Sequence, residues 1–269
     1  MAPQCNQSSK GWDSSALSGD PHQRADKADR VRAMFTAIAH AYDFNNRVHS
    51  FGLDQRWRRI AVRLSGPIER ASVLDVACGT GDLTLEFARA GAAEVVGLDY
   101  TPAMLDHARV KAARAGGRCA GVAFIEGDAQ ALPYPNASFD RVSIAFGLRN
   151  VADPQSALRE FHRVLRPGGR LIVLEFAEPT SAIVRFAHQL YTNRIMPWTA
   201  TLLARDRSGA YRYLPRSVQT FLDPSALKEQ LNHAGFSKVE QHPLTMGTCV
   251  ISVAFVADEP TSRYTRNDQ

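Results

Sequence analysis

Cysteine is scarce in this 269-residue sequence, and its spacing argues against the common metal and redox sites. The 4 cysteines stand at positions 5, 78, 119 and 249, with no Cys-x-x-Cys or Cys-x-x-His pairing. Neither a zinc site nor a dithiol redox pair is therefore indicated. The histidines at positions 49, 107, 162 and 188 also lack metal-ligand spacing. We expect free thiols and no bound metal.

The sequence also has no run of 18 apolar residues. Its most apolar stretch, residues 182–204, is interrupted by Arg185, His188, Asn193 and Arg194, so it does not predict a membrane span. Residues 1–29 are polar and lack the apolar core of a secretory signal. We expect a cytoplasmic protein, with peripheral contact to the inner face of the membrane left open.

Charge of one sign is in only small excess. The chain has 32 basic and 27 acidic residues, which gives a net charge of +5, and its arginines are scattered. We therefore expect no nucleic-acid binding, which is typical of clustered basic residues. Compositional bias accounts for the excess, together with a mildly cationic face toward an anionic membrane. The content of 45% hydrophobic and 22% charged residues is typical of a globular protein.

The organisation along the chain predicts one folded domain between two tails. Residues 1–29 are expected to be disordered because they carry little apolar surface, residues 30–257 to form the domain, and residues 258–269 to form a flexible tail. Val31, Met34 and Ile38 recur at helical spacing, which predicts a helix that ends near the polar stretch 42–46. A second helix is expected over residues 57–64, stopped by the Gly-Pro pair at 66–67.

From residue 72 onward, short apolar runs alternate with amphipathic segments. Strands are predicted at 72–77, 93–98, 122–126, 141–146, 170–175, 238–244 and 249–257, and helices at 83–90, 102–115, 155–165 and 224–234. Such alternation predicts an α/β fold with a doubly wound, mostly parallel seven-stranded sheet. A helical insertion is expected at about 181–204.

A glycine loop follows the first predicted strand. Gly79 and Gly81 stand where the strand turns into a helix, so a ligand can approach the backbone there. Asp99 ends the next strand, where a carboxylate can accept two hydrogen bonds from a ribose diol; the alternative is a solvated loop acid. Thr84 occupies the third glycine position of a dinucleotide site.

The acids near this loop suit a cationic nucleoside. Asp75 and Asp82 add negative charge, which favours S-adenosylmethionine, with its sulfonium and ammonium groups, over a phosphate-bearing ligand. After the third strand, Asp128 can accept a hydrogen bond from an adenine amino group, and Ala129 can donate its backbone N–H. The alternative for Asp128 is a helix cap.

Several segments resemble a known family. Residues 75–82, Asp99, residues 127–129 and 132–135, and residues 165–169 resemble class I S-adenosylmethionine-dependent methyltransferases. Residues 35–57 (FTAIAHAYDFNNRVHSFGLDQRW), 146–151 (FGLRNV), 174–176 (LEF) and 211–214 (YRYL) resemble the UbiE/MenG family of quinone C-methyltransferases. The resemblance extends over about residues 31–246. In two places the sequence departs from it: Ala145 replaces a serine, with Ser143 two residues earlier, and no His-Arg-Gly-Tyr stretch follows Met246.

The resemblance implies a Rossmann-like class I methyltransferase domain with an N-terminal helical lid. It implies that Thr80, Asp99, Asp128 and Ala129 bind S-adenosylmethionine. The substrate that it implies is a polyprenylated quinol, either demethylmenaquinol or 2-methoxy-6-polyprenyl-1,4-benzoquinol, methylated at a ring carbon in menaquinone or ubiquinone biosynthesis. Two other functions stay open: a different small-molecule methyltransferase, and a non-catalytic cofactor-binding scaffold of a quinone-synthesis complex.

The ring carbon becomes nucleophilic when a ring hydroxyl loses its proton. We predict that Arg149 lowers the pKa of this hydroxyl, since a close opposite charge favours the ionised form, and that Asn150 orients an oxygen. The alternative is that Arg149 ties its loop to Asp153. Tyr42, with Asp43 and Asn46, is expected to cover the sulfonium as a lid; the alternative is packing for Tyr42 and helix capping for Asp43.

The helical insertion carries apolar residues on one side, among them Ile183, Phe186 and Leu190, with Arg185 and Arg194 available to phosphates. This pattern is typical of an interfacial membrane helix. A homodimer contact or a core-packing helix is the alternative.

Overall fold

The computed structural model describes residues 11–13, 16–179, 181–191, 194 and 209–258. At its centre lies one seven-stranded sheet in the order β3-β2-β1-β4-β5-β7-β6. The strands are β1 (Ser72–Val76), β2 (Glu94–Asp99), β3 (Ala123–Glu126), β4 (Phe139–Ala145), β5 (Leu165–Phe176), β6 (Lys238–Leu244) and β7 (Cys249–Phe255). All pairs are parallel except the two that β7 forms. The doubly wound, mostly parallel sheet expected from the sequence is confirmed.

The predicted strand limits hold to within two residues, with one exception. β5 begins five residues earlier than expected, because Leu165 already pairs with Phe139 ahead of a shift in register. The helix before it accordingly ends at Val164.

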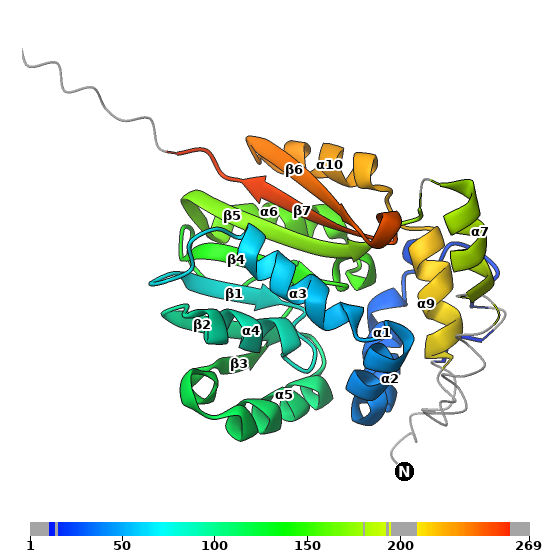
Figure 1. Ribbon diagram of the computed structural model, residues 1–269, viewed down its shortest axis with the longest axis horizontal. Helices are drawn as coiled ribbons and strands as arrows, with labels where there is room; N and C mark the ends of the chain where they lie inside the picture. The colour runs from blue at the N-terminus through cyan, green and yellow to red at the C-terminus, as the bar shows by residue number, and fades with distance from the viewer. Residues whose placement is uncertain (1–10, 14–15, 180, 192–193, 195–208, 259–269) are drawn as a thin grey trace, which may run out of the picture.

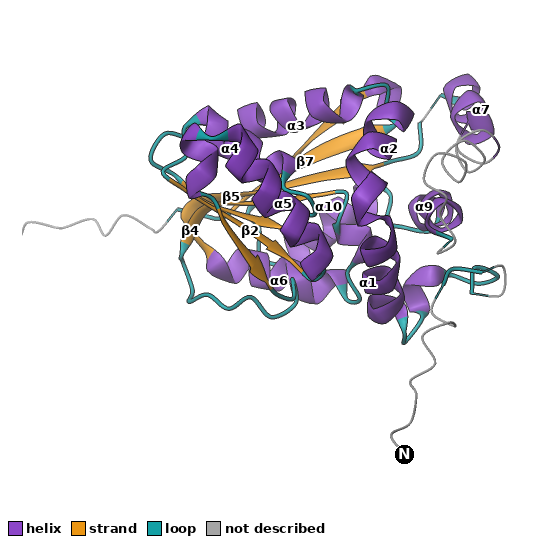
Figure 2. Ribbon diagram, turned by 90° about the horizontal axis from the view of Figure 1, so that it is seen from below, coloured by secondary structure: helices purple, strands orange, loops and turns teal. Residues whose placement is uncertain are grey.

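Helices cover both faces of the sheet (Figure 2). One face carries α3 (Leu53–Leu64), α4 (Asp82–Ala90) and α5 (Pro102–Ala115), and the other carries α6 (Pro154–Val164) and α10 (Pro224–His233). Val73 packs in the first core and Leu74 in the second, because successive side chains of a strand point to opposite faces. Both cores are almost wholly apolar.

A further group of helices gathers beyond one end of the strands (Figure 1). It consists of α1 (Lys27–Ile38), α2 (Tyr42–His49), α7 (Ala182–Leu190) and α9 (Ala210–Gln219). The first helix ends shortly before the polar stretch at 42–46, as expected, but after a 3-10 turn at Ala39–Ala41 that stretch opens α2, which was not expected. Local propensity is weak there, and tertiary contacts of Asp43 described below decide the outcome. Most of the expected insertion after Tyr191 lies outside the described residues.

The described residues of the N-terminal segment, 11–13 and 16–29, are packed, so the disorder expected for residues 1–29 is wrong for that part; the rest lies outside the described residues. Trp12 is fully buried, and residues Pro21–Gln23 form a 3-10 turn. A third apolar cluster joins this segment to α1 and α9: Trp12, Ala16, Val31, Met34, Ile38, Ala210 and Tyr213. One tryptophan contributes much of the buried area, since its ring alone can bury about 150–250 Å². The prediction of disorder was based on the average composition of the segment, which does not show that a single residue, Trp12, is buried.

Among the residues that the structure describes, none of the helices has the length and apolar character that crossing a membrane requires.

Candidate functional site

A pocket opens at the carboxyl ends of the parallel strands, beside α1. Its cavity volume is about 100 Å³, and it is open to solvent on one side. It lies where the strand order reverses, since β1 has β2 on one side and β4 on the other. Ligands of open α/β sheets bind in the crevice at this point. Of the ten predicted site residues, six line the pocket: Tyr42, Gly79, Asp99, Asp128, Ala129 and Asn150.

Asp99 is the charged group at the centre of one wall. Its Oδ2 accepts a hydrogen bond from Gly79 N (2.8 Å), and its Oδ1 accepts one from Thr101 N (2.8 Å). Burial raises the pKa of its carboxyl, although these N–H donors oppose the shift. A carboxylate offers about four acceptor positions. Further hydrogen bonds come from the backbone of Tyr100 and the side chain of Thr101, and the carboxylate still lines the pocket.

The opposite end of this wall is formed by residues 127–129. A Cβ at Gly127 would lie 2.7 Å from Leu98 Cδ1, so only glycine fits there without a shift of Leu98. Asp128 Oδ1 accepts from Gln130 N (2.9 Å) in a turn, with no helix there for it to cap, and Asp128 lines the pocket. The apolar side chains of Val76, Leu98 and Met104 complete the wall.

Asp75 does not line the pocket. Its side chain is buried, and its oxygens accept hydrogen bonds from the hydroxyls of Thr84 (2.6 Å) and Ser143 (2.6 Å). Burial raises the pKa of its carboxyl to about 6. The structure therefore does not place Asp75 where it could contact a ligand in the pocket, because both of its carboxylate oxygens accept hydrogen bonds inside the fold. Ser143 serves this acid, while Ala145 reaches the pocket.

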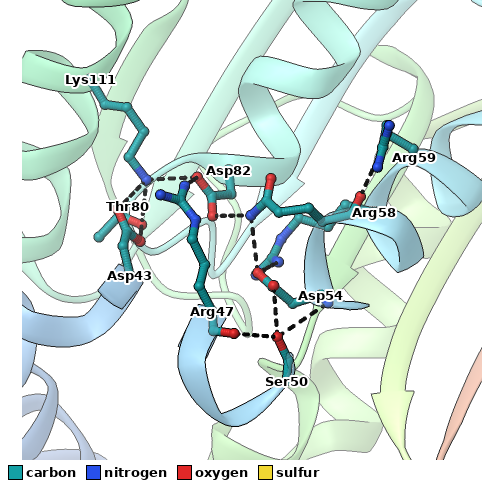
Figure 3. Close-up of polar contacts among 10 residues, drawn as sticks. Asp43, Arg47, Ser50, Asp54, Arg58, Arg59, Thr80, Asp82 and Lys111 are labelled. Atoms are coloured by element: carbon teal, nitrogen blue, oxygen red, sulfur yellow. Dashed lines mark hydrogen bonds and ion pairs between the residues drawn. The ribbon is translucent and has the colours of Figure 1, made fainter. Parts of the chain in front are cut away.

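Helix α2 is clamped onto the glycine loop by an ion cluster (Figure 3). Lys111 Nζ, from α5, contacts Asp43 Oδ2 (2.5 Å) and Asp82 Oδ1 (2.7 Å). The hydroxyl of Thr80 donates to Asp43 Oδ1 (2.5 Å). Burial alone would raise the pKa of Asp82, but the positive charges of Lys111 and Arg58 and the attached hydrogen bonds hold it below its usual value.

The clamp has two consequences for the predicted residues. Asp43 makes an interhelical ion pair rather than the helix cap considered as an alternative, and its neighbour Tyr42 lies on the pocket wall. Thr80 and Gly81 belong to the same loop without lining the pocket, so a direct ligand contact stays a prediction for them.

Arg149 is buried behind the loop that follows β4. Its Nη1 donates to Phe146 O (2.8 Å) and forms an ion pair with Glu175, which is also buried. Its Nε is buried and has no hydrogen-bond partner among the described residues. The alternative tie to Asp153 is wrong, because Asp153 caps α6 through Gln155 N and Ser156 N.

Sequence reasoning did not identify Glu175 as part of the site. The available signal was a single acid at the end of the otherwise apolar run 171–176. Asn150, by contrast, is where it was expected: it lines the pocket, its side-chain amide donates to Phe146 O (3.2 Å), and its Oδ1 accepts from Tyr213 Oη (3.0 Å).

Comparison with known proteins identifies the family. Residues 23–256 match the model of the ubiE/COQ5 methyltransferase family. The chain belongs to this family. A demethylmenaquinone methyltransferase of Thermus thermophilus is 49% identical over 221 residues, which cover 82% of this chain and 98% of that protein. The ubiquinone/menaquinone biosynthesis C-methyltransferase UbiE of Cronobacter sakazakii is 41% identical over 223 residues, which cover 82% of this chain and 88% of that protein.

Solved structures share the fold of this ubiE/COQ5 family member. An S-adenosylmethionine-dependent methyltransferase of Thermotoga maritima superposes with a TM-score of 0.58 at 19% identity, over 84% of this chain and 99% of that one. A Haloferax volcanii methyltransferase in complex with its Trm112 activator gives 0.60 at 18% identity, over 83% and 97%. The class I methyltransferase fold expected from the resemblance is thus confirmed. Within the described residues, no group of His, Cys, Asp and Glu side chains could hold a metal ion.

The burial of Asp75 predicts how stability depends on pH. The pKa of its carboxyl is about 6 in the folded chain and 3.8 ordinarily, so the folded state binds the proton more tightly than the unfolded state. Protonation of Asp75 therefore stabilises the fold below about pH 4, and this stabilisation is lost as the pH rises through about 6. Asn at this position does not titrate, so the free energy of unfolding of Asp75→Asn minus that of wild type should increase by about 2–3 kcal/mol from pH 4 to pH 7. Urea denaturation at the two pH values measures this difference.

The matched control is Glu69→Gln, which changes an exposed carboxylate and should give no such trend. A large loss of S-adenosylmethionine affinity in Asp75→Asn, with a stability difference independent of pH, would instead support direct ligand contact by Asp75.

Proposed function

We propose that this chain transfers a methyl group from S-adenosylmethionine to a ring carbon of a polyprenylated quinol. Demethylmenaquinol and 2-methoxy-6-polyprenyl-1,4-benzoquinol are the candidate substrates. The observation that carries the proposal is the match to the ubiE/COQ5 family over residues 23–256, with relatives at 40–49% identity that are named for this methylation. The pocket at the sheet edge supports it, because two segments that resemble the family, residues 35–57 and 146–151, both contribute to its lining.

The residues of the pocket fit S-adenosylmethionine. Asp99 at the end of β2 suits the ribose hydroxyls, and the apolar side chains of Leu98 and Met104 suit the adenine ring. Asp128 with the backbone N–H of Ala129 suits the polar edge of that ring. Tyr42 covers the side of the pocket next to Gly79, where a Cβ would lie 3.9 Å from the tyrosine ring. When bound, this cofactor supplies an electrophilic methyl group.

Arg149 and Asn150 are proposed to act on the quinol. The ion pair with Glu175 and the bond to Phe146 O hold Nη1 of Arg149 in place, which leaves Nε as a buried donor. Arg149 does not line the pocket itself, so it acts on the quinol through its charge and through the loop that it holds. The guanidinium charge favours loss of the ring hydroxyl proton, which makes the ring carbon nucleophilic. Asn150, which lines the pocket, orients an oxygen of the same ring.

The function is tested by assaying the purified chain with S-adenosylmethionine and each of the two quinols, kept reduced. We expect a product heavier by one methyl group, identified by mass spectrometry, with at least one quinol. If the chain binds S-adenosylmethionine in calorimetry yet methylates neither quinol, the proposal fails, and another small-molecule substrate or a scaffold role takes its place.

The role of Arg149 is tested by Arg149→Ala. A close opposite charge lowers the pKa of an ionisable group by about 1–3 units, so its loss should reduce kcat about 10–1,000-fold at neutral pH and move the pH profile to alkaline values. The kcat of Arg149→Lys should lie between those of wild type and Arg149→Ala. Lysine keeps the positive charge, but its ammonium lacks the planar guanidinium geometry that lets arginine pair with Glu175 and donate a second hydrogen bond at once. The affinity for S-adenosylmethionine should stay within about twofold of wild type.

Wild-type turnover and an unchanged pH profile in Arg149→Ala would contradict this role. Both variants are compared at equal folded fraction, because Arg149 and Glu175 are buried and removal of either leaves a buried charge.

Contact with an anionic membrane is proposed for the surface made by α7 and Phe51. The side chains of Ile183 and Phe186 are 82% and 71% exposed, and Phe51 is 79% exposed. The ring of Tyr191, at the end of α7, lies 5.9 Å from that of Phe51, which joins the two parts. Large exposed apolar side chains on one helix are typical of interfacial helices. A polyprenyl tail would leave the bilayer at such a surface.

Liposomes of anionic phospholipid test this surface. Wild type should co-sediment with them and Phe186→Asp should not, whereas Val110→Asp, a matched change of an exposed apolar side chain on α5, should bind as wild type does. Negligible binding by wild type would reject the membrane contact. A concentration-dependent dimer that is lost in Phe186→Asp would then assign the same surface to a homodimer.

A further inference from the structure

The N-terminal segment reaches the functional site although part of it lies outside the family match. Trp12 precedes residue 23, where the match begins. Its indole is fully buried and stacks on the ring of Tyr213 in α9, with the centroids 4.3 Å apart and the planes at 24°. The segment therefore has a defined contact with a helix that follows it by about 200 residues.

Tyr213 connects Trp12 to a residue of the pocket. Its hydroxyl donates a hydrogen bond to Asn150 Oδ1 (3.0 Å), and Asn150 lines the pocket. Burial raises the pKa of the Tyr213 hydroxyl, so it stays protonated and able to donate at neutral pH. The stacked indole limits the positions open to the tyrosine ring, and the ring sets the position of the hydroxyl.

The seat of Trp12 is specific. A Cβ at Gly209 would lie 2.1 Å from Trp12 O, and Gly209 has a φ of +79°, so glycine alone fits on both counts. Arg30 Nη1 donates to Gly11 O (2.6 Å), and its guanidinium lies 5.9 Å from the centre of the Trp12 ring. Contacts from α1 and from the start of α9 thus hold residues 11 and 12 in place.

A second attachment comes from the first residue of α1. Lys27 is buried, and its Nζ donates to Val151 O (2.5 Å). Val151 follows Asn150 and also lines the pocket. The loop Leu148–Asn150 and the residue after it are therefore held from two sides, by Trp12 through Tyr213 and by Lys27 directly.

We propose that the N-terminal segment is a buttress of the loop that carries Arg149 and Asn150, with Trp12 as a positioning residue that acts through Tyr213. The inference rests on the proposed function, in which this loop holds the quinol. Binding of S-adenosylmethionine depends on other residues, chiefly Asp99 and Asp128. Loss of the buttress should therefore affect methyl transfer more than cofactor affinity.

Three variants test the buttress. Trp12→Ala removes the stacking ring and should lower kcat about tenfold or more, with the S-adenosylmethionine affinity within twofold of wild type, because misplacement of a reacting group by about 1 Å can cost 100-fold. Trp12→Phe keeps an aromatic ring on Tyr213 and should restore most of the rate. Tyr213→Phe keeps the stack but loses the hydroxyl, so kcat should fall without a matching fall in melting temperature.

The control Gln23→Ala changes an exposed side chain of the same segment and should behave as wild type. Full turnover in both Trp12→Ala and Tyr213→Phe would overturn the proposal. Equal losses of kcat and of cofactor affinity in Tyr213→Phe would also overturn it, since they would indicate a general structural defect.

Hydrogen–deuterium exchange separates this proposal from the proposed function. Peptides that cover residues 148–151 should exchange faster in Trp12→Ala than in wild type, without any substrate present, while peptides of β1 and β2 should not change. Unchanged exchange at 148–151 would reject the buttress even in an active enzyme. Faster exchange in a chain that methylates no quinol would support the buttress and reject only the assigned reaction.

Discussion

The reversal of strand order at β1 is the constraint on which the rest of the site depends. From β1 the chain builds outward to β2 and β3, and it then returns to lay β4 on the other side of β1. The loops that leave β1 and β4 thus diverge, and a crevice stays open between them. Gly79, Asp99 and Asn150 come from three strands of this edge and meet in one pocket for that reason. The helices beyond this end of the strands, α1, α2 and α9, cover or support the pocket edge.

Buried acids close to the crevice are balanced in different ways, and the differences separate support from ligand binding. Asp75 is met by two hydroxyls and no cation, so its pKa rises and its charge stays away from the pocket. Asp82 and Glu175 are met by Lys111 and Arg149. Asp99 is met by N–H and hydroxyl groups of its own loop and of Gly79 and by no cation, and it lines the pocket.

Pattern and spacing predicted the sheet because buried parallel strands are short apolar runs, which need no knowledge of their neighbours. Gly79 and Asp99 were predictable because strand ends in such a sheet share an edge. The helical state of 42–49, the partner of Arg149 and the burial of Trp12 were not predictable. Each of these three features depends on contacts between residues far apart in the chain: Asp43 with Lys111, Arg149 with Glu175, and Trp12 with Tyr213. Local sequence patterns do not predict such contacts.

The cover of the site is one packed unit made from separate stretches of chain. The third apolar cluster joins Trp12, α1 and Tyr213, and Tyr42 packs against it. Tyr42 lines the pocket, and Tyr213 donates a hydrogen bond to Asn150, which also lines it. Closely packed interiors transmit displacement because they have little free volume. Tyr42 and Asn150, which both line the pocket, are thus mechanically linked through this cluster, and the N-terminal segment is part of that link.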